Sequence, residues 1–376
     1  MPGKKKKIVV LTIPVGGGHL TAAKIIHQAL QAEAGEAAEI VTIDVLHEWL
    51  PGSPQFFTKG YENSVKNFRS TPYKLVYNFA DAQPKLVEDA FALVFQGLGK
   101  KLIEREQPDV IVTTFPIVSY VIHKVLQTLG RKMPIISIVT DAGDVHKLWF
   151  MGINDTVITA TEDTIAHAVR SGVPREKLHY FGFPVLTSFK KLPSRKKARE
   201  QLGYRDMPTV LITNGGLGMN PKKVLNIAEE IAARKLPYQV AFICGKNESL
   251  YNELMAMDFG QTPVHIYQFV PNMPTFLAAC DIVCTKAGWL SVSEAIEARR
   301  PMILFDIIPG QEEPNAQYVL KHGFGEVIAN PANVVSRLEA LLGKPALLKA
   351  YQTVYKDRVS GGVASKRIAE FILGQV

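Results

Sequence analysis

Long apolar runs are missing from this chain of 376 residues. No stretch approaches the roughly 20 apolar residues that a membrane-spanning helix requires. The opening segment passes from a lysine run straight into a strand-like run, without an apolar helix or a small-residue cleavage site, so no secretory signal peptide is predicted. With 47% hydrophobic and 21% charged residues, the composition is typical of a globular protein, and we expect a cytoplasmic one with two domains.

Cysteine is also scarce, since the chain contains only Cys244, Cys280 and Cys284. Three cysteines give no disulfide framework, and none of them belongs to a CxxC pair. Cys280 and Cys284 are four positions apart, but they lie where a helical pattern changes into a strand pattern. We expect all three to be buried structural thiols.

Acidic residues are fewer than basic ones, 35 against 43, which gives a net charge of +8. Half of this excess lies in the run Lys4 to Lys7. A moderate basic excess suits nucleic acid, anionic lipid or small anions as partners. No RNP-like aromatic strand and no zinc-finger spacing accompanies it, so no nucleic-acid partner is expected. The lysine run is equally compatible with an ordinary solvated terminus.

What the chain does have is a regular alternation of short apolar runs with helical patterns. Parallel sheets covered by helices on both faces produce this alternation, because each strand is then apolar on both sides. The runs form two series, which predicts an α/β protein with two doubly wound domains. Strands are expected at residues 7–13, 39–45, 109–115, 135–141 and 156–161, and then at 209–216, 239–245, 264–270, 281–288 and 301–308.

The joint between the two series is expected within residues 179–203, where glycine and prolines precede a basic run. An open cleft between two such domains would face the carboxyl ends of both sheets, where doubly wound folds bind ligands. Residues 47–100 break the alternation and interleave Trp, Phe and Tyr with Lys and Arg. This mixture suits a membrane interface. An ordinary helical insertion with its aromatic rings in the core explains it almost as well.

Two glycine-rich turns each follow a predicted strand and open a predicted helix. The first, Gly16 to Gly18, does not match GxGxxG, and no GK[ST] follows, which excludes a Walker loop. The second is TNGGLGMNPKK at residues 213–223. The N-terminus of a helix offers unpaired N–H groups and a positive dipole end. A cleft that contains both turns therefore suits a substrate with a diphosphate and an acceptor held against it.

Two histidines are candidates for proton transfer. His19 follows the first glycine turn, and its ordinary pKa near working pH would let it accept a proton from an acceptor hydroxyl or stabilise charge. A helix-start histidine bonded to the backbone is the alternative. His146 is the second candidate, with Asp141 close by in the sequence, because an Asp–His pair can polarise a hydroxyl. Trp149 would supply a flat apolar wall.

Seven short motifs, in order along nearly the whole chain, resemble those of the glycosyltransferases of family 28. The resemblance is strongest to the group of the monogalactosyldiacylglycerol synthases and the processive diacylglycerol glucosyltransferases. The motifs are GGGH at 16–19, TDAGDVHKLWF at 140–150, GFPV at 182–185, NGGLG at 214–218, CGKN at 244–247, TKAG with SVSEA at 285–295, and PGQEEPN at 309–315.

This resemblance implies a GT-B fold, in which two Rossmann-like domains face a central cleft. Residues 1–185 would bind the acceptor lipid, 350–376 would return to that domain, and 186–349 would bind the nucleotide sugar. The resemblance also implies that no metal ion and no cofactor is needed. That agrees with the sequence, which shows no obvious Asp-x-Asp pair at a strand end.

The resemblance also implies roles for individual residues. The diphosphate would be surrounded by backbone N–H groups of the second glycine turn and by the Lys246 cation. Glu294 would accept hydrogen bonds from the ribose hydroxyls. Residues 311 and 312 would contact the sugar. The implied sites comprise His19, Asp141 and His146 for catalysis; Gly16, Gly17, Gly18 and Trp149 for the acceptor; and Gly215, Gly216, Leu217, Gly218, Lys246, Phe269, Val270, Gly288, Glu294, Gln311 and Glu312 for the UDP-sugar.

The implied function is an inverting hexosyltransferase that moves sugar from UDP-glucose or UDP-galactose to diacylglycerol or a related lipid. It would act as a peripheral protein on the anionic inner face of the cell membrane. A non-lipid acceptor, or a module that binds nucleotide sugars without turnover, stays open. Leu186 stands where the family has arginine, and Trp289 where it has a small residue or proline. The sugar, the acceptor, the number of sugars added and the oligomeric state are not predicted.

Overall fold

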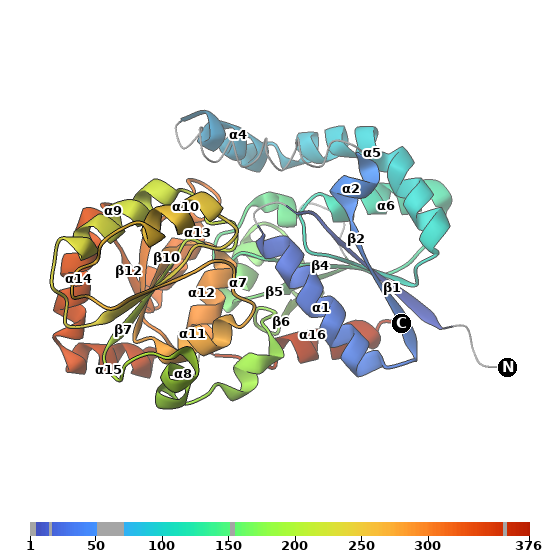
Figure 1. Cartoon of the computed structure of the whole chain (residues 1–376). Helices are drawn as coiled ribbons and strands as arrows, with labels where there is room; N and C mark the ends of the chain where they lie inside the picture. Colours follow the sequence, from blue (N-terminus) through green and yellow to red (C-terminus); the bar gives the residue numbers. More distant parts are fainter. Residues whose placement is uncertain (1–4, 15–16, 51–70, 151–154, 356–358) are drawn as a thin grey trace. The chain divides into compact units, whose positions relative to one another are not determined.

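The computed structural model describes residues 5–14, 17–50, 71–150, 155–355 and 359–376 (Figure 1). The chain forms two compact units, which are described separately. The first comprises Met1–Leu186, Pro309–Pro314 and Val363–Val376, and the second comprises Thr187–Ile308 and Asn315–Gly362. Within the described residues, no helix combines the length and the apolar character that crossing a membrane requires.

The first unit contains a parallel sheet of six strands in the order β2-β1-β3-β4-β5-β6. Its central strands are rich in valine and isoleucine and are buried on both faces, as expected for a sheet covered by helices on both sides. The strands are β1 (Lys6–Thr12), β2 (Ala38–Asp44), β3 (Val110–Thr113), β4 (Ile135–Ile138), β5 (Thr156–Thr159) and β6 (Leu178–Tyr180).

Helices cover both faces of this first sheet. The helices α1 (Gly18–Ala34) and α16 (Ala364–Leu373) pack side by side against one face, so the end of the described chain completes the core of the first unit (Figure 1). The opposite face is covered by α2 (Val45–Trp49), α5 (Pro84–Glu106) and α6 (Val118–Leu129). Helices α4 (Thr71–Ala82) and α7 (Glu162–Arg170) and the 3-10 turns η1 (Lys147–Trp149) and η2 (Arg175–Lys177) complete the unit.

The second unit contains another parallel six-stranded sheet, in the order β12-β11-β10-β7-β8-β9. Its strands are β7 (Thr209–Thr213), β8 (Gln239–Ile243), β9 (Val264–Tyr267), β10 (Ile282–Lys286), β11 (Met302–Asp306) and β12 (Gly325–Val327). The helical elements around it are η3 (Thr187–Lys191), α8 (Arg195–Leu202), α9 (Pro221–Ala232), α10 (Glu248–Met255), α11 (Met273–Ala279), α12 (Trp289–Glu297), α13 (Glu313–Lys321), α14 (Ala332–Leu342) and α15 (Pro345–Val354).

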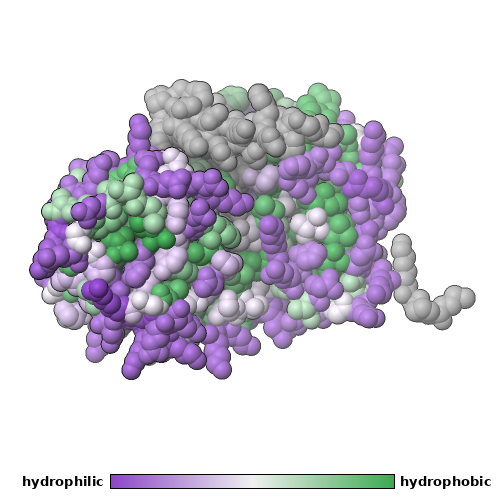
Figure 2. Space-filling view, viewed as in Figure 1, coloured by the Kyte–Doolittle hydropathy of each residue, from purple (hydrophilic) through white to green (hydrophobic). Residues whose placement is uncertain are grey.

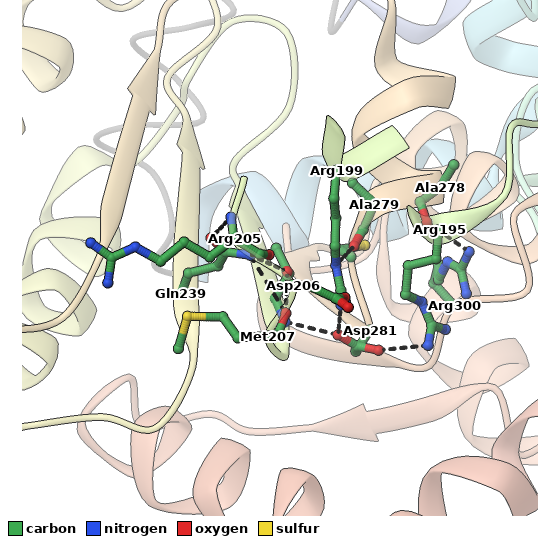
Figure 3. Close-up of polar contacts among 12 residues, drawn as sticks. Arg195, Arg199, Arg205, Asp206, Met207, Gln239, Ala278, Ala279, Asp281 and Arg300 are labelled. Carbon is green, nitrogen blue, oxygen red and sulfur yellow. Dashed lines mark hydrogen bonds and ion pairs between the residues drawn. The ribbon is translucent and has the colours of Figure 1, made fainter. Parts of the chain in front are cut away.

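A polar network fixes α8 to the amino ends of the strands in the second unit (Figure 3). Asp281, just before β10, accepts hydrogen bonds from Arg199 Nη2 at 2.7 Å and from the Thr209 backbone N–H at 2.8 Å. Its other carboxylate oxygen lies 2.9 Å from Arg195 Nη1. This network joins α8, β7 and β10 at one edge of the sheet, which is the edge opposite the glycine-rich turn.

All ten predicted strands are present: β1 and β2 have the predicted length and are shifted by one residue toward the N-terminus, and the other eight are shorter than predicted. Strands β6 and β12 were not predicted, because three residues are too few for an apolar pattern to show. The prediction for the cysteines is confirmed, since all three thiols are free and buried. The first boundary between the units falls at Leu186, and the chain rejoins the first unit at Val363.

The basic N-terminal run is partly built into the sheet. Lys6 and Lys7 start β1, and Lys7 Nζ lies 2.9 Å from Glu106 Oε2 and 3.0 Å from Glu39 Oε1. These two carboxylates raise the pKa of Lys7. Lys7 therefore contributes to the structure of the first unit rather than to a free basic tail, whereas Lys4 lies outside the described residues.

Candidate functional site

Each sheet has one point where the strand order reverses. In the first unit this point lies between β1 and β3, and in the second it lies between β7 and β10. Loops that leave neighbouring strands in opposite directions open a crevice at such a point, and ligands of doubly wound folds bind there. His19 and the first glycine turn follow β1 in the first unit, and the second glycine turn and Glu294 follow β7 and β10 in the second.

His19 lies at the reversal point of the first unit, in the first turn of α1. Its Nδ1 lies 2.8 Å from the carbonyl oxygen of Thr114, which follows β3, and 2.7 Å from the hydroxyl of Thr140, which follows β4. The Thr114 hydroxyl in turn donates to the His19 carbonyl oxygen at 3.0 Å. Two loops that are distant in sequence thus fix the ring of one histidine.

These contacts determine which ring nitrogen of His19 carries the proton. A carbonyl oxygen only accepts, so Nδ1 donates to Thr114, and the lone pair of the neutral ring is on Nε2. Only 7% of His19 is exposed, and burial lowers its pKa to about 4, although the Thr114 carbonyl acts in the opposite direction. The imidazole is therefore neutral near pH 7 and can accept a proton at Nε2.

His146 is held differently from His19. Its Nε2 donates to the Tyr77 carbonyl oxygen at 3.1 Å, and its Nδ1 accepts from the backbone N–H of Leu148 at 3.1 Å. The carboxylate of Asp81 lies 3.6 Å from Nδ1, and burial lowers the pKa of His146. With both ring nitrogens engaged, this histidine joins α4 to the 3-10 turn η1.

The other predicted residues of the first unit occupy varied positions. Asp141 is half-buried after β4 and follows Thr140 in the loop that contacts His19. Trp149 is buried in a small core, and its ring centroid is 6.1 Å from that of His19. Gly17 precedes α1 with a φ of 79°, a conformation that favours glycine. Gly18 is the first residue of α1, whereas Gly16 lies outside the described residues.

The glycine-rich turn of the second unit is packed tightly against the turn that follows β8. A Cβ atom on Gly218 would lie 2.2 Å from the carbonyl oxygen of Cys244, and one on Gly245 would lie 2.5 Å from that of Gly216. The Asn247 amide donates to the Gly218 carbonyl at 2.8 Å, and the Lys246 N–H donates to the Gly216 carbonyl at 3.0 Å. The backbone from Gly215 through Leu217 to Gly218 is thereby fixed just before α9.

Two lysines lie beside this turn. The Lys246 side chain is exposed, and its backbone N–H holds the turn, as described above. Lys286, the last residue of β10, was not predicted as a site residue. Its Cε would lie 3.0 Å from a Cβ atom on Gly215, so its aliphatic stem lies directly against the glycine turn. Both lysines provide positive charge near the turn.

Glu294 is a buried carboxylate on α12, the helix that follows β10 and Gly288. Only 8% of the residue is exposed, and burial raises its pKa to about 8. No group in the described part of the chain donates a hydrogen bond to this carboxylate. Burial of a carboxylate is costly unless hydrogen bonds satisfy it. The geometry therefore suits a ligand that brings hydroxyl groups to Glu294.

The remaining predicted residues lie on loops. Phe269 and Val270 follow β9, and the Phe269 side chain is largely exposed. Gln311 and Glu312 lie on Pro309–Pro314, a segment that belongs to the first unit, whereas the sequence assigned it to the domain that binds the sugar nucleotide. Gln311 is half-buried and Glu312 is buried.

Some residues of these sites escaped prediction. Thr114 and Thr140 orient His19, but they are 95 and 121 positions away from it, and no local pattern connects them. A threonine near the carboxyl end of a predicted strand was the available signal for both. For Lys286 the signal was a cation at the carboxyl end of a strand. Among the described residues, no group of three or more His, Cys, Asp or Glu side chains could hold a metal ion.

Comparison with protein families matches two parts of the chain. Residues 19–185 match the family model described as monogalactosyldiacylglycerol (MGDG) synthase, and residues 209–358 match the glycosyltransferase family 28 C-terminal domain. The chain is 30% identical to a probable chloroplastic monogalactosyldiacylglycerol synthase of Nicotiana tabacum, over 88% of this chain and 64% of the relative. It therefore spans less than two thirds of the length of that relative.

A bacterial relative matches over more of its length. The chain is 28% identical to a processive diacylglycerol beta-glucosyltransferase of Bacillus mycoides, over 98% of this chain and 94% of the relative. Among solved structures, MurG of Acinetobacter baumannii gives a TM-score of 0.63 at 14% identity, covering 99% of this chain and 100% of that one. The calicheamicin glycosyltransferase CalG4 gives 0.61 at 16% identity, covering 99% of each chain. These likenesses confirm the predicted GT-B fold.

Proposed function

Because the chain belongs to glycosyltransferase family 28, in the group of the monogalactosyldiacylglycerol synthases and the processive diacylglycerol glucosyltransferases, we propose that it transfers a hexose from a UDP-sugar to diacylglycerol. The observation that carries this proposal is the buried Glu294 carboxylate, which no described protein group satisfies. The ribose of a UDP-sugar offers two neighbouring hydroxyl groups, which a carboxylate accepts in bidentate fashion.

The glycine turn supports the same assignment for the diphosphate. Backbone N–H groups at the start of α9 present a positive dipole end, and small residues allow a bulky group to approach the backbone closely. Lys286 and Lys246 add positive charge beside the turn. Neutralisation of the diphosphate by these groups, without a metal ion, is part of the proposal. Whether the sugar is glucose or galactose is left to the assay below.

His19 is the proposed general base. Its Nε2 lone pair would take the proton of the acceptor hydroxyl while that oxygen attacks C1 of the sugar. The bond between C1 and the phosphate oxygen breaks, the UDP leaves with the electron pair, and the configuration at C1 inverts. Thr114 and Thr140 hold the ring so that Nδ1 keeps its proton throughout. The acceptor site would include Gly17, Gly18 and the loop with Asp141.

The proposed place of action is the inner surface of the cell membrane, with the protein bound peripherally. Helix α5 supports this part, since Leu86, Phe91, Leu93 and Val94 are exposed although they are apolar. In Figure 2, apolar atoms appear along the upper margin of the first unit, where Figure 1 draws α5. Exposed apolar side chains on an amphipathic surface suit contact with lipid.

The test of the UDP site is calorimetric titration of UDP into Glu294→Ala. We expect binding to weaken by about 1.5–3 kcal/mol, the scale of a lost hydrogen bond to a charged group. Because the free carboxyl has a raised pKa of about 8, binding of ribose hydroxyls to the ionised form should release protons at pH 7. Titrations in two buffers with different ionisation enthalpies measure that release, and Glu294→Ala should abolish it.

Glu229→Gln is the matched control, because Glu229 is an exposed carboxylate on α9. A folded Glu294→Ala protein with unchanged UDP affinity would remove Glu294 from the site. The reaction itself is tested by offering UDP-glucose and UDP-galactose with diacylglycerol in liposomes and identifying the product. A hexosylated soluble acceptor without hexosylated diacylglycerol would overturn the lipid acceptor, and nucleotide-sugar binding without any product would overturn the enzyme.

A further inference from the structure

The first unit contains a cavity of about 80 Å³ with purely apolar walls. Four elements form it: the end of β1, the short helix α2, the middle of α5 and the start of α6. The ten residues that line the cavity are Ile13, Val45, Leu46, Trp49, Leu50, Phe91, Phe95, Phe115, Ile117 and Val118. Without polar groups in its walls, the cavity cannot satisfy the hydroxyls of a sugar or the charges of a nucleotide.

One wall of this cavity is shared with the candidate active site. Phe115 lines the cavity, and its ring meets the ring of His19 edge-on, with centroids 5.0 Å apart. Phe115 directly follows Thr114, whose carbonyl holds His19. A molecule in the cavity would therefore be separated from the proposed base by one aromatic ring.

The opposite wall of the cavity leads to the exposed surface of α5. Phe91 lines the cavity and is nevertheless 42% exposed, so it belongs both to the interior and to the surface. Leu93 and Val94 next to it are more exposed still. Lys85 and Lys100, both exposed, flank this apolar stretch of α5. Cations around an apolar patch match an anionic headgroup layer around acyl chains.

We propose that this cavity binds one acyl chain of the acceptor lipid. The inference rests on the proposed function and adds to it the place where the acceptor is recognised. An acyl chain that enters past Phe91 and ends beside Phe115 would bring the glycerol hydroxyl of the same lipid toward His19. The small volume of the cavity accommodates part of one acyl chain. Leu46, Leu50 and Phe95 are only half-buried and can move aside for a longer part.

The first test narrows the cavity with Leu46→Trp. Leu46 is half-buried, so the larger side chain can turn toward the cavity without replacing a fully buried residue. We expect kcat/KM for diacylglycerol to fall at least tenfold, with unchanged affinity for UDP. Leu129→Trp is the matched control, since Leu129 is a half-buried leucine that packs on the same core but does not line the cavity. Equal kcat/KM in wild type and Leu46→Trp would overturn the proposal.

The second test is independent of turnover. Trp49 lines the cavity and stacks on Phe95 with centroids 5.2 Å apart, so a brominated acyl chain in the cavity should quench its fluorescence. We expect dibromostearoyl diacylglycerol in vesicles to quench the wild type, and Trp49→Phe to lose most of this quenching. The tryptophans at 149 and 289 remain as internal references.

The two tests distinguish the inference from the function. Hexosylated diacylglycerol without quenching that depends on Trp49 overturns the acyl cavity and keeps the proposed function. Quenching that depends on Trp49 without any hexosylated lipid supports the cavity as a site for acyl chains and overturns the proposed reaction.

Discussion

At the scale of single residues, two threonines determine which ring nitrogen of His19 can accept a proton. Thr114 and Thr140 both approach Nδ1, so the opposite nitrogen is the one that can accept a proton. Burial keeps the ring neutral over the whole physiological pH range, because its pKa falls to about 4. A free histidine would be partly protonated at pH 6, and this one is not.

His19→Ala should reduce turnover by roughly 10²–10⁴, the usual contribution of a general base. UDP affinity should not change, because the residues that we propose bind UDP at the glycine turn belong to the other unit. The pH dependence is a second readout. The unfolded chain takes up a proton at this position near pH 6.5 and the folded protein near 4, so the free energy of unfolding should fall as pH decreases between these values.

In His19→Ala this part of the pH dependence should disappear, which urea denaturation at pH 7 and pH 5 measures. Because His19 stays neutral between pH 8 and pH 5, its protonation should not lower the kcat/KM of the wild type in this range. A His19→Ala enzyme with normal turnover would show that the histidine serves only to start α1.

The sequence indicated His19 because it follows a glycine turn after a predicted strand, whereas Glu294 was implied by the resemblance to family 28, and both functional roles stay predictions. It could not identify Thr114 and Thr140, whose contact with His19 depends on three strands meeting at one edge of the sheet. It also paired His146 with Asp141 on proximity in the chain, whereas the structure places Asp81 of α4 at His146. A side chain from an insertion cannot be placed by local spacing.

At the scale of elements, strand prediction succeeded wherever valine and isoleucine filled both faces of a strand. It failed for the three-residue strands β6 and β12, which lie at the sheet edges and bury less. The turns after the strands carry the specificity of the fold. The turn at Gly218 is the tightest of those near the predicted UDP site, because the carbonyl of Cys244 occupies the space of a side chain.

Gly218→Ala should therefore disrupt the turn, and Gly260→Ala is its matched control. Both glycines have a positive φ, 58° and 56°, but a Cβ atom on Gly260 meets nothing within 4 Å. Gly260→Ala should cost about 1–2 kcal/mol of stability, the cost of a left-handed conformation. Gly218→Ala should cost more and should also weaken UDP binding at least tenfold, as urea denaturation and calorimetry would show. Equal losses in both variants would contradict the tight packing of the two turns.

At the scale of the whole molecule, the proposed action at a membrane leads to predictions about the charge and the exposed apolar surface. The excess of basic residues is moderate, and Lys6 and Lys7 are bound to carboxylates of the first unit. We therefore expect the proposed lipid contact to depend more on α5 than on the lysine run. Residues 84–100 of α5 belong to the segment 47–100, whose composition suits a membrane interface, and residues 51–70 of that segment lie outside the described part.

Replacement of Leu86 and Leu93 by serine should reduce binding to anionic liposomes at least fivefold in a flotation assay. Both side chains are exposed, so the stability of the protein and its UDP affinity should stay the same. Binding of the wild type should weaken as salt rises, since charges are screened over about 10 Å at 0.1 M. Undiminished binding of the double variant would exclude α5 as the membrane contact.

The packing of α16 on α1 has a consequence for synthesis. The ribosome completes β6 near residue 180, but the part of the sheet and the side of α1 that α16 covers stay exposed until residues 364–373 have emerged. At 5–20 residues per second, this leaves roughly 10–40 s in which the first unit exists without its last helix. Most of the second unit is made during this time, whereas the nascent first unit offers chaperones an exposed apolar surface. The half of the protein that is made first thus waits for residues 364–373 before its own core is complete.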